Sequence, residues 1–93
     1  MEDKIQKLIN LYETSYDSFK GVFVYRNLQP MDTDFTSILF YDDIFHFEFC
    51  DDNIEDFRFT IADIKDIKFD NVGSMVVSII ELDNGDVIMI HNL

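Results

Sequence analysis

The sequence is poor in the residues that form disulfides and tight turns: its 93 residues include one cysteine, one proline and three glycines. It also contains no tryptophan. Because Cys50 stands alone, an intramolecular disulfide is excluded, and the fold does not depend on an oxidising compartment. No apolar run approaches the roughly 20 residues that a membrane-spanning helix needs, and the first residues are acidic where a signal peptide is basic. These absences predict a cytoplasmic protein, either of a bacterium or, if it is phage-encoded, of the infected host.

Basic side chains are also scarce, since seven lysines and arginines stand against nineteen aspartates and glutamates, for a net charge of −12. Affinity for nucleic acids and for anionic lipids comes mainly from Lys and Arg on phosphate groups. The charge therefore argues against direct nucleic-acid binding and against membrane binding, whereas the same field would attract a basic partner. Ten of the acids and a single base, Arg58, fall between residues 32 and 63.

Apolar residues are plentiful: they make up 47% of the chain, which is too apolar to be disordered and has the length of one domain, residues 1–93. Residues 1–18 predict an amphipathic helix, and the alternating residues 20–93 predict an antiparallel sheet. We therefore expect an α+β fold, with the N-terminal helix packed on a twisted antiparallel β-sheet or small β-barrel of about six to seven strands. The apolar stripe of the helix consists of Ile5, Leu8, Ile9, Tyr12 and Tyr16.

Two hairpins are predicted with their turns. Residues 35–41 and 44–50 flank Asp42-Asp43, a turn that would pair Phe40 with Phe45 and face the remaining phenylalanines to one side. Residues 74–82 and 87–91 flank Asn84-Gly85, which predicts a type I′ turn because both of its central residues take positive φ easily. Residues 29–34, which contain Pro30, predict a loop.

Three potential metal ligands alternate along one predicted strand: His46, Glu48 and Cys50. Side chains two positions apart on a strand lie about 6–7 Å from each other, whereas the ligands of one ion must converge on it. The spacing therefore predicts no metal site. Residues 51–63 begin like an EF-hand loop, but Asp56 and Ala62 replace its required Gly and Glu, so we expect at most weak calcium binding.

Catalytic motifs are missing from the sequence. Nineteen acids give no means of singling out a catalytic pair, and Gly21, Gly73 and Gly85 are too far apart to form a phosphate-binding loop. A domain of this size also has little room for a substrate pocket. We expect a protein that is not an enzyme and that holds no cofactor.

The acids at the predicted turns are the candidate partner-binding residues. Carboxylates about 6–7 Å apart on strand ends would imitate the phosphates of a nucleic-acid strand. A basic nucleic-acid-binding protein or nuclease would then bind them in place of its substrate, and the chain would act as a small acidic inhibitory protein that occludes that basic site. These candidate residues are Asp42, Asp43, Asp51, Asp52, Glu55 and Asp56.

In size, charge and composition the chain resembles phage-encoded anti-defence inhibitors, such as anti-CRISPR and anti-restriction DNA mimics, and the immunity proteins of nuclease toxins. Two alternatives stay open. The acids could serve only to solvate an aromatic-rich β-protein. The chain could instead be a non-catalytic structural or regulatory interaction module that acts by sheet-edge pairing or homo-oligomerisation.

Overall fold

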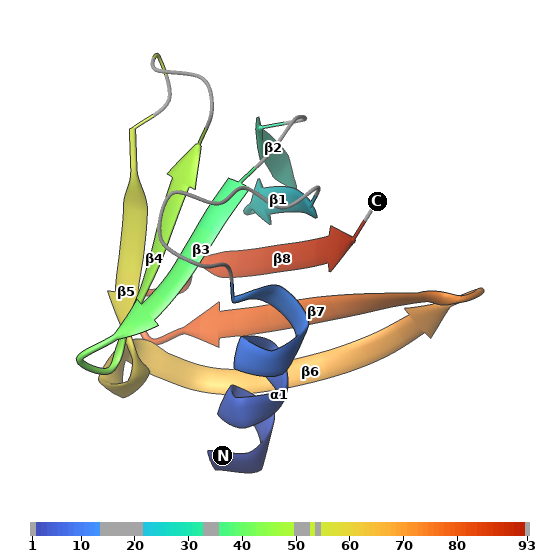
Figure 1. The fold of residues 1–93 in the computed structure, drawn as a ribbon, viewed down its shortest axis with the longest axis horizontal. Coiled ribbons are helices and arrows are strands. Elements are labelled where there is room, and N and C mark those ends of the chain that lie inside the picture. The colour runs from blue at the N-terminus through green and yellow to red at the C-terminus, as the bar shows by residue number, and fades with distance from the viewer. Residues whose placement is uncertain (1, 14–21, 33–35, 50–52, 54, 93) are drawn as a thin grey trace.

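One α-helix and eight β-strands make up the fold, which the computed structural model describes for residues 2–13, 22–32, 36–49, 53 and 55–92 (Figure 1). The strands form two antiparallel sheets, one in the order β2-β1-β8-β7-β6 and one in the order β3-β4-β5. Along the chain the elements are α1 (Glu2–Tyr12), β1 (Val22–Arg26), β2 (Gln29–Asp32), β3 (Thr36–Tyr41), β4 (Ile44–Phe49), β5 (Phe57–Thr60), the 3-10 helix η1 (Ile61–Asp63), β6 (Ile64–Val72), β7 (Met75–Leu82) and β8 (Val87–Asn92).

The strands of the three-stranded sheet cross those of the five-stranded sheet steeply (Figure 1). The chain passes from β5 to β6 through η1, which forms the corner between the sheets. The α+β class and the single N-terminal helix are confirmed for the described residues. The expected single sheet or barrel of six to seven strands is corrected, since eight strands form two sheets that do not close into a barrel. A barrel would need hydrogen bonds between the two sheets' edge strands, and among the described residues no strand of one sheet pairs with a strand of the other.

The additional strand is β2, which lies where the sequence predicted a loop. β2 pairs with β1 alone and is therefore an edge strand. Pro30 has no N–H to donate, and an edge strand tolerates this because one of its sides faces no partner strand. The turn before β2 is Asn27-Leu28, where both residues have positive φ (52° and 69°), as a two-residue hairpin turn requires.

The register of the β3–β4 hairpin is confirmed. Phe40 pairs with Phe45, and Asp42 and Asp43 form the turn, with φ angles of 49° and 62°. The alternation of apolar and polar residues fixes this register, because a shift by one residue would move every phenylalanine of β4 out of the core. The remaining predicted pairs also match: Ile38 with Phe47, Thr36 with Phe49, Tyr41 with Ile44, Leu39 with His46 and Ser37 with Glu48.

The β7–β8 hairpin forms as predicted, but its turn is not of type I′. Gly85 has a positive φ of 94°, whereas Asn84 does not. The N–H of Gly85 donates to the carbonyl oxygen of Leu82 at 3.0 Å, and the N–H of Leu82 donates to Asp86 at 2.9 Å. This is a three-residue loop that ends in a left-handed glycine. The glycine still supplies the positive φ, but one position later in the loop than an Asn-Gly turn would use it.

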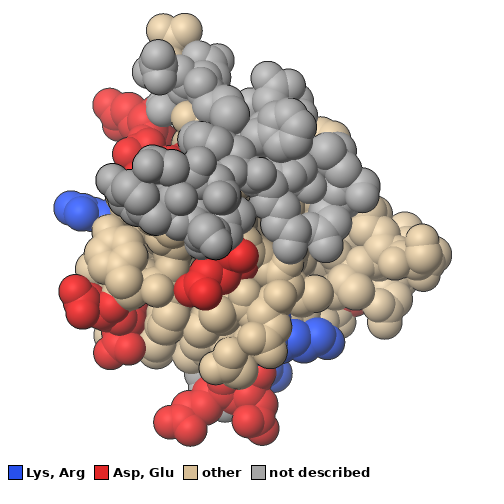
Figure 2. Space-filling model, viewed as in Figure 1, with Lys and Arg blue, Asp and Glu red and all other residues tan. Residues whose placement is uncertain are grey.

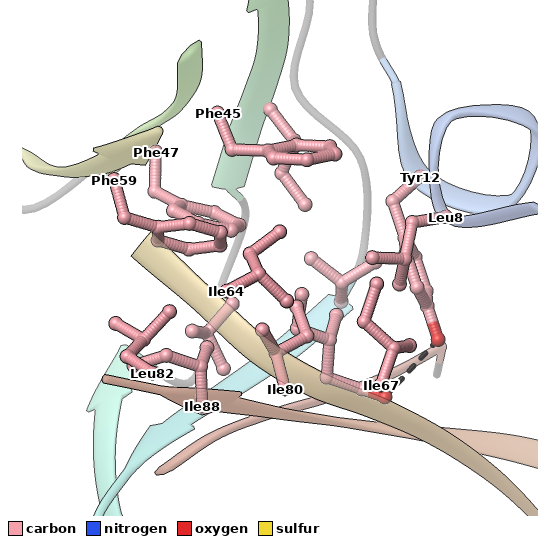
Figure 3. Close-up of a cluster of buried hydrophobic side chains, with 14 of the residues drawn as sticks. Leu8, Tyr12, Phe45, Phe47, Phe59, Ile64, Ile67, Ile80, Leu82 and Ile88 are labelled. Carbon is pink, nitrogen blue, oxygen red and sulfur yellow. Dashed lines mark hydrogen bonds between the residues drawn. The ribbon is translucent and has the colours of Figure 1, made fainter. Parts of the chain in front are cut away.

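The core lies between the two sheets. Phe45, Phe47 and Phe59 project from the three-stranded sheet toward aliphatic residues of the five-stranded sheet (Figure 3). The ring of Phe59 lies 5.5 Å from that of Phe45 and 5.7 Å from that of Phe47, within the range of favourable aromatic contacts. The Cα radius of gyration is 12.2 Å, and about 12 Å is expected for a compact chain of this length. The labelled aliphatic residues of the five-stranded sheet are Ile64, Ile67, Ile80, Leu82 and Ile88.

The helix α1 is shorter than the predicted 1–18 and ends at Tyr12. Its buried residues are Ile5, Leu8 and Tyr12, which follow the predicted apolar stripe; Tyr16 lies outside the described residues. The helix lies over β6 and β7 (Figure 1), and its last residue also bonds to β8. The last backbone hydrogen bond of the helix runs from Glu13 to Ile9, at 2.9 Å.

A buried hydroxyl ties the end of α1 to the sheet. Tyr12 is 1% exposed and donates a hydrogen bond to the carbonyl oxygen of Ile90 at 3.1 Å. Because a tyrosine has one hydroxyl proton, the Ser78 hydroxyl, 2.6 Å away, is the donor to the tyrosine oxygen. Burial raises the pKa of Tyr12, so the hydroxyl stays protonated and this arrangement persists through neutral pH.

The substitution Tyr12→Phe removes this hydroxyl and keeps the ring. It leaves the Ser78 hydroxyl, which is 0% exposed, without its tyrosine partner, and we expect the free energy of unfolding to fall by about 1–3 kcal/mol in urea denaturation. Adding Ser78→Ala should recover part of the loss, because it removes the orphaned group. Tyr25→Phe, on the opposite face of the sheet, is the control. If the Tyr12→Phe protein were as stable as the wild type, the Tyr12 hydroxyl would not stabilise the packing of α1 on the sheet, and the prediction would be wrong.

Candidate functional site

The predicted acidic residues occupy two places at opposite ends of β4. Asp42 and Asp43 lie in the β3–β4 turn, and Glu55 and Asp56 lie just before β5; all are exposed. A six-residue strand such as β4 separates them by roughly 20 Å. Asp51 and Asp52 fall outside the described residues. The four described candidates therefore lie in two groups, not in one.

The described acidic side chains in Figure 2 form several separate groups. In this view the described carboxylates do not form a single continuous array like the phosphates along a duplex. Any partner that reads these charges must therefore contact one group, or span the gap between two.

One group is larger than the sequence indicated. The turn residues Asp42 and Asp43 are joined by Asp63 of η1 and by Asp83 of the β7–β8 turn. The backbone N–H of Ile61 donates to the carbonyl oxygen of Asp43 at 2.9 Å, and the N–H of Asp83 donates to that of Asp63 at 2.8 Å. All four side chains are exposed. We call this set, Asp42, Asp43, Asp63 and Asp83, the acidic end.

Sequence reasoning missed Asp63 and Asp83, although a signal was present. Both residues stand beside turns, and antiparallel strands bring alternate turns to the same end of a domain. What the sequence could not supply was the packing of the two sheets, which decides that the β3–β4 turn and the β7–β8 turn meet at η1 (Figure 1).

Local hydrogen bonds hold the carboxylate of Asp63 in place, and the backbone conformation is defined at Asp42 and Asp43. Asp63 accepts hydrogen bonds from the backbone N–H of Thr60 at 2.9 Å and from its hydroxyl at 3.0 Å, which caps η1. Asp42 and Asp43 stand at positive φ, a region that L-residues other than Asn and Asp seldom occupy. Within the described part of the chain, none of the four carboxylates forms an ion pair with a Lys or Arg side chain.

A cleft of about 390 Å³ opens beside the acidic end, between β5 and the β7–β8 turn. The guanidinium of Arg26 lies 2.7 Å from the Asp86 carboxylate and 4.9 Å from the centre of the Phe57 ring. Two of the three lining carboxylates, those of Asp63 and Asp86, are already engaged in structural bonds, which does not favour acid–base catalysis there. The lining residues are Arg26, Phe57, Arg58, Phe59, Asp63, Leu82, Asp83, Asn84 and Asp86.

Asp86 links two turns. Its carboxylate accepts hydrogen bonds from the Asn27 side chain at 3.1 Å and from Arg26 at 2.7 Å, while the Asn27 side-chain oxygen accepts from the backbone of Val87 at 2.9 Å. The bond from Asn27, followed by the bond from Arg26, holds the pKa of Asp86 below its ordinary value. These bonds fix the β7–β8 turn, and with it Asp83, against the β1–β2 turn.

The outer face of the three-stranded sheet carries a second arrangement of interest. The side chains of His46, Glu48 and Asp56 each offer a ligand atom, and these atoms lie within 4.8 Å of one another. The sequence prediction considered only ligands in a row along one strand. Asp56 comes from beyond the β4–β5 connection and forms a different set with His46 and Glu48. Cys50 falls outside the described residues, so the prediction for the row His46, Glu48 and Cys50 stays a prediction.

The chain matches no known protein-family model, and no curated protein or solved structure matches it with significance. In the part of the chain that the structure describes, no helix is long and apolar enough to span a membrane. Function must therefore be argued from the residues themselves.

The acid dependence of stability provides a test of the Asp86 bonds. Because the folded pKa of Asp86 lies below the unfolded value of about 3.9, its carboxylate stabilises the fold above that pH, and this contribution is lost as the pH falls through the folded pKa. We expect Asp86→Asn to lower the melting temperature at pH 7 and to reduce the drop on acidification below about pH 4. Glu55→Gln, an exposed change, is the control; equal acid dependence in both variants would contradict the prediction.

The β3–β4 turn generates a second prediction. Asp43→Gly relieves the positive φ of 62°, and we expect it to raise the free energy of unfolding by about 0.5 kcal/mol or more. Asp43→Ala removes the same charge but keeps a Cβ, and it should destabilise the protein. Denaturation of both variants separates backbone strain from charge. If Asp43→Gly and Asp43→Ala changed the free energy of unfolding equally, the predicted backbone strain at Asp43 would be contradicted.

Proposed function

We propose that this protein is a small acidic inhibitory binding protein that occludes the basic site of a nucleic-acid-binding protein or nuclease, as phage anti-defence DNA mimics and toxin-immunity proteins do. The acidic end is the surface that we assign to the contact. Glu55 and Asp56 form a second acidic group that a large partner could reach. Asp51 and Asp52, which are also predicted contact residues, lie outside the described residues. The proposed function is binding, with no chemical step.

The observation that carries the proposal is that the β3–β4 turn consists of two aspartates at positive φ. A two-residue turn with positive φ at both positions is best formed by Asn-Gly, whereas Asp42-Asp43 combines two strained residues with two like charges. No Lys or Arg side chain in the described part of the chain pairs with either carboxylate. A turn that only joined two strands would be more stable without these aspartates. A surface that binds cationic groups needs them.

Rigidity supports the same function. The turn, η1 and the β7–β8 loop are joined by backbone hydrogen bonds of 2.8–2.9 Å, and Asp63 is further fixed as a cap. Charges that are already in place lose little entropy on binding, so a partner's Arg and Lys side chains would meet a preorganised surface. The net charge of −12 adds a long-range attraction that speeds the encounter with a basic protein.

The test neutralises the acidic end without straining its turn. In a triple variant, Asp42→Asn and Asp43→Gly create a favourable turn, Asp83→Asn removes the third charge, and the cap Asp63 stays. The variant and the wild type are assayed against a panel of bacterial nucleases and basic DNA-binding proteins, by DNA cleavage and by mobility shift. We expect the wild type to inhibit a panel member, less so as salt rises, and the variant to lose at least tenfold in potency.

A matched control removes three charges elsewhere, with Glu2→Gln, Asp3→Asn and Glu13→Gln on and after α1, and should keep wild-type potency. A further variant, with Asp51, Asp52, Glu55 and Asp56 changed to their amides, reports on the second acidic group. The proposal fails if the wild type inhibits no member of the panel at low salt, or if the acidic-end variant inhibits at the wild-type dose.

A second candidate function, homo-oligomerisation, is favoured by the outer face of the five-stranded sheet. Side chains of directly paired residues share a face, and two rows of uncharged residues cross β1, β8 and β7 there. An apolar face of this kind suits a symmetric dimer. Light scattering in high salt separates the two ideas, because an apolar dimer persists there while an electrostatic complex dissociates. The rows are Phe23, His91 and Val77, and Tyr25, Met89 and Ile79.

A further inference from the structure

Three potential metal ligands converge on the outer face of the three-stranded sheet, about one strand length from the acidic end. His46 and Glu48 are two residues apart on β4 and project to the same side, away from the phenylalanine core. Asp56 precedes the neighbouring strand β5 and turns back toward them. The His46 side chain is 17% exposed, while the two carboxylates are more open, at 42% and 57%.

The three possible ligand atoms surround a small space that an ion could occupy, because they lie within 4.8 Å of one another. His46 Nε2 lies 3.5 Å from Asp56 Oδ2 and 4.0 Å from Glu48 Oε1. Both exceed the roughly 2.7–3.2 Å of an N–H···O hydrogen bond, so the atoms face one another without bonding closely. In a tetrahedral site with bonds of about 2.0–2.2 Å, neighbouring ligand atoms are about 3.3 Å apart. Small side-chain rotations would close the observed set to that value.

A hydrogen bond to its second ring nitrogen also orients the imidazole of His46. The Tyr41 hydroxyl lies 3.1 Å from Nδ1 of His46, on the side of the ring opposite to the carboxylates. When Nδ1–H donates to the tyrosine oxygen, Nε2 keeps its lone pair and points it at the gap. Metal-bound histidines in proteins are held in this way by an acceptor for their second ring nitrogen.

We propose that His46, Glu48 and Asp56 bind one divalent transition-metal ion, with Zn²⁺ the best fit, and that Tyr41 orients the imidazole without touching the ion. One imidazole and two carboxylates suit Zn²⁺, whereas Ca²⁺ and Mg²⁺ prefer oxygen ligands throughout. The two carboxylates neutralise the charge of the ion. The openness of the site leaves a fourth position for water.

The ion would act as a brace. His46 and Glu48 belong to β4, and Asp56 follows the connection that leads to β5, so a bound ion closes that connection at its base. This role is separate from the acidic end, which lies at the other end of β4, although Asp56 also belongs to the second acidic group. One opposing charge is nearby: Arg58 is the Cα partner of His46 on β5. Its guanidinium should weaken cation binding without blocking it.

The test is calorimetric titration of the intact, metal-free chain with ZnCl₂, supported by the visible absorption of Co²⁺. We expect one ion per chain and a rise in melting temperature on saturation. His46→Gln should weaken binding at least tenfold, and Tyr41→Phe by about 10-fold or more, because the orienting group of a metal-bound histidine is worth 10–100-fold. Arg58→Gln should tighten binding. Each variant is checked by circular dichroism, and Glu55→Gln, a neighbouring carboxylate outside the cluster, should bind as the wild type does.

The opposite results are equally definite. The proposal is wrong if wild-type protein shows no Zn²⁺ binding up to millimolar ion, or if folded His46→Gln binds as tightly as the wild type. It is also wrong if Ca²⁺ binds with the affinity of Zn²⁺ and His46→Gln leaves both unchanged, since that result describes a general acidic surface. The DNA-cleavage and mobility-shift assays of inhibition are repeated with and without chelator. They show whether metal binding affects inhibition through the acidic end.

Discussion

The alternation of β4 is the constraint on which the rest of the structure depends. Its inward residues, Phe45, Phe47 and Phe49, anchor the core between the two sheets, while His46 and Glu48 face outward. The burial of three aromatic rings fixes the register of the strand, since a slip of one residue would expose all of them. The same register sets Asp42-Asp43 as the turn at one end and leads toward Asp56 at the other. The alternation of β4 therefore determines both the core and the positions of the candidate sites.

The acidic surface is organised by turns rather than by strands. Along a strand, like charges would repel and would occupy positions that cross-strand pairs could use for stability. At turns, the carboxylates extend into solvent, and the backbone hydrogen bonds between neighbouring turns hold them without help from basic side chains. The pairs that do involve bases lie elsewhere: Lys4 with Asp66, Arg26 with Asp86, and Lys68 with Glu81. The four carboxylates of the acidic end are therefore among the described acids that no Lys or Arg side chain pairs with.

Local patterns predicted the fold class, the helix and the pairs of the β3–β4 hairpin, because periodicity and turn chemistry act between residues close in sequence. They failed where a longer-range contact decided the outcome. Pro30 signals a loop, yet β2 forms because its unpaired side lies at the sheet edge. Asn84-Gly85 signals a type I′ turn, yet bonds from Leu82 and Asp86 select a longer loop. The split of one sheet into two followed from the η1 corner, which carries no strong signal of its own.

The sequence by itself determined the excess of negative charge, the alternation that buries the phenylalanines and the turn at Asp42-Asp43, since each depends on composition or on neighbours along the chain. Only the tertiary structure decided which acids stand together. Asp63 and Asp83 join the acidic end because the crossing of two sheets brings distant turns into contact, and Asp56 joins His46 and Glu48 because β4 pairs with β5. No spacing along the chain encodes that crossing; it follows from how the two sheets bury their apolar faces against each other.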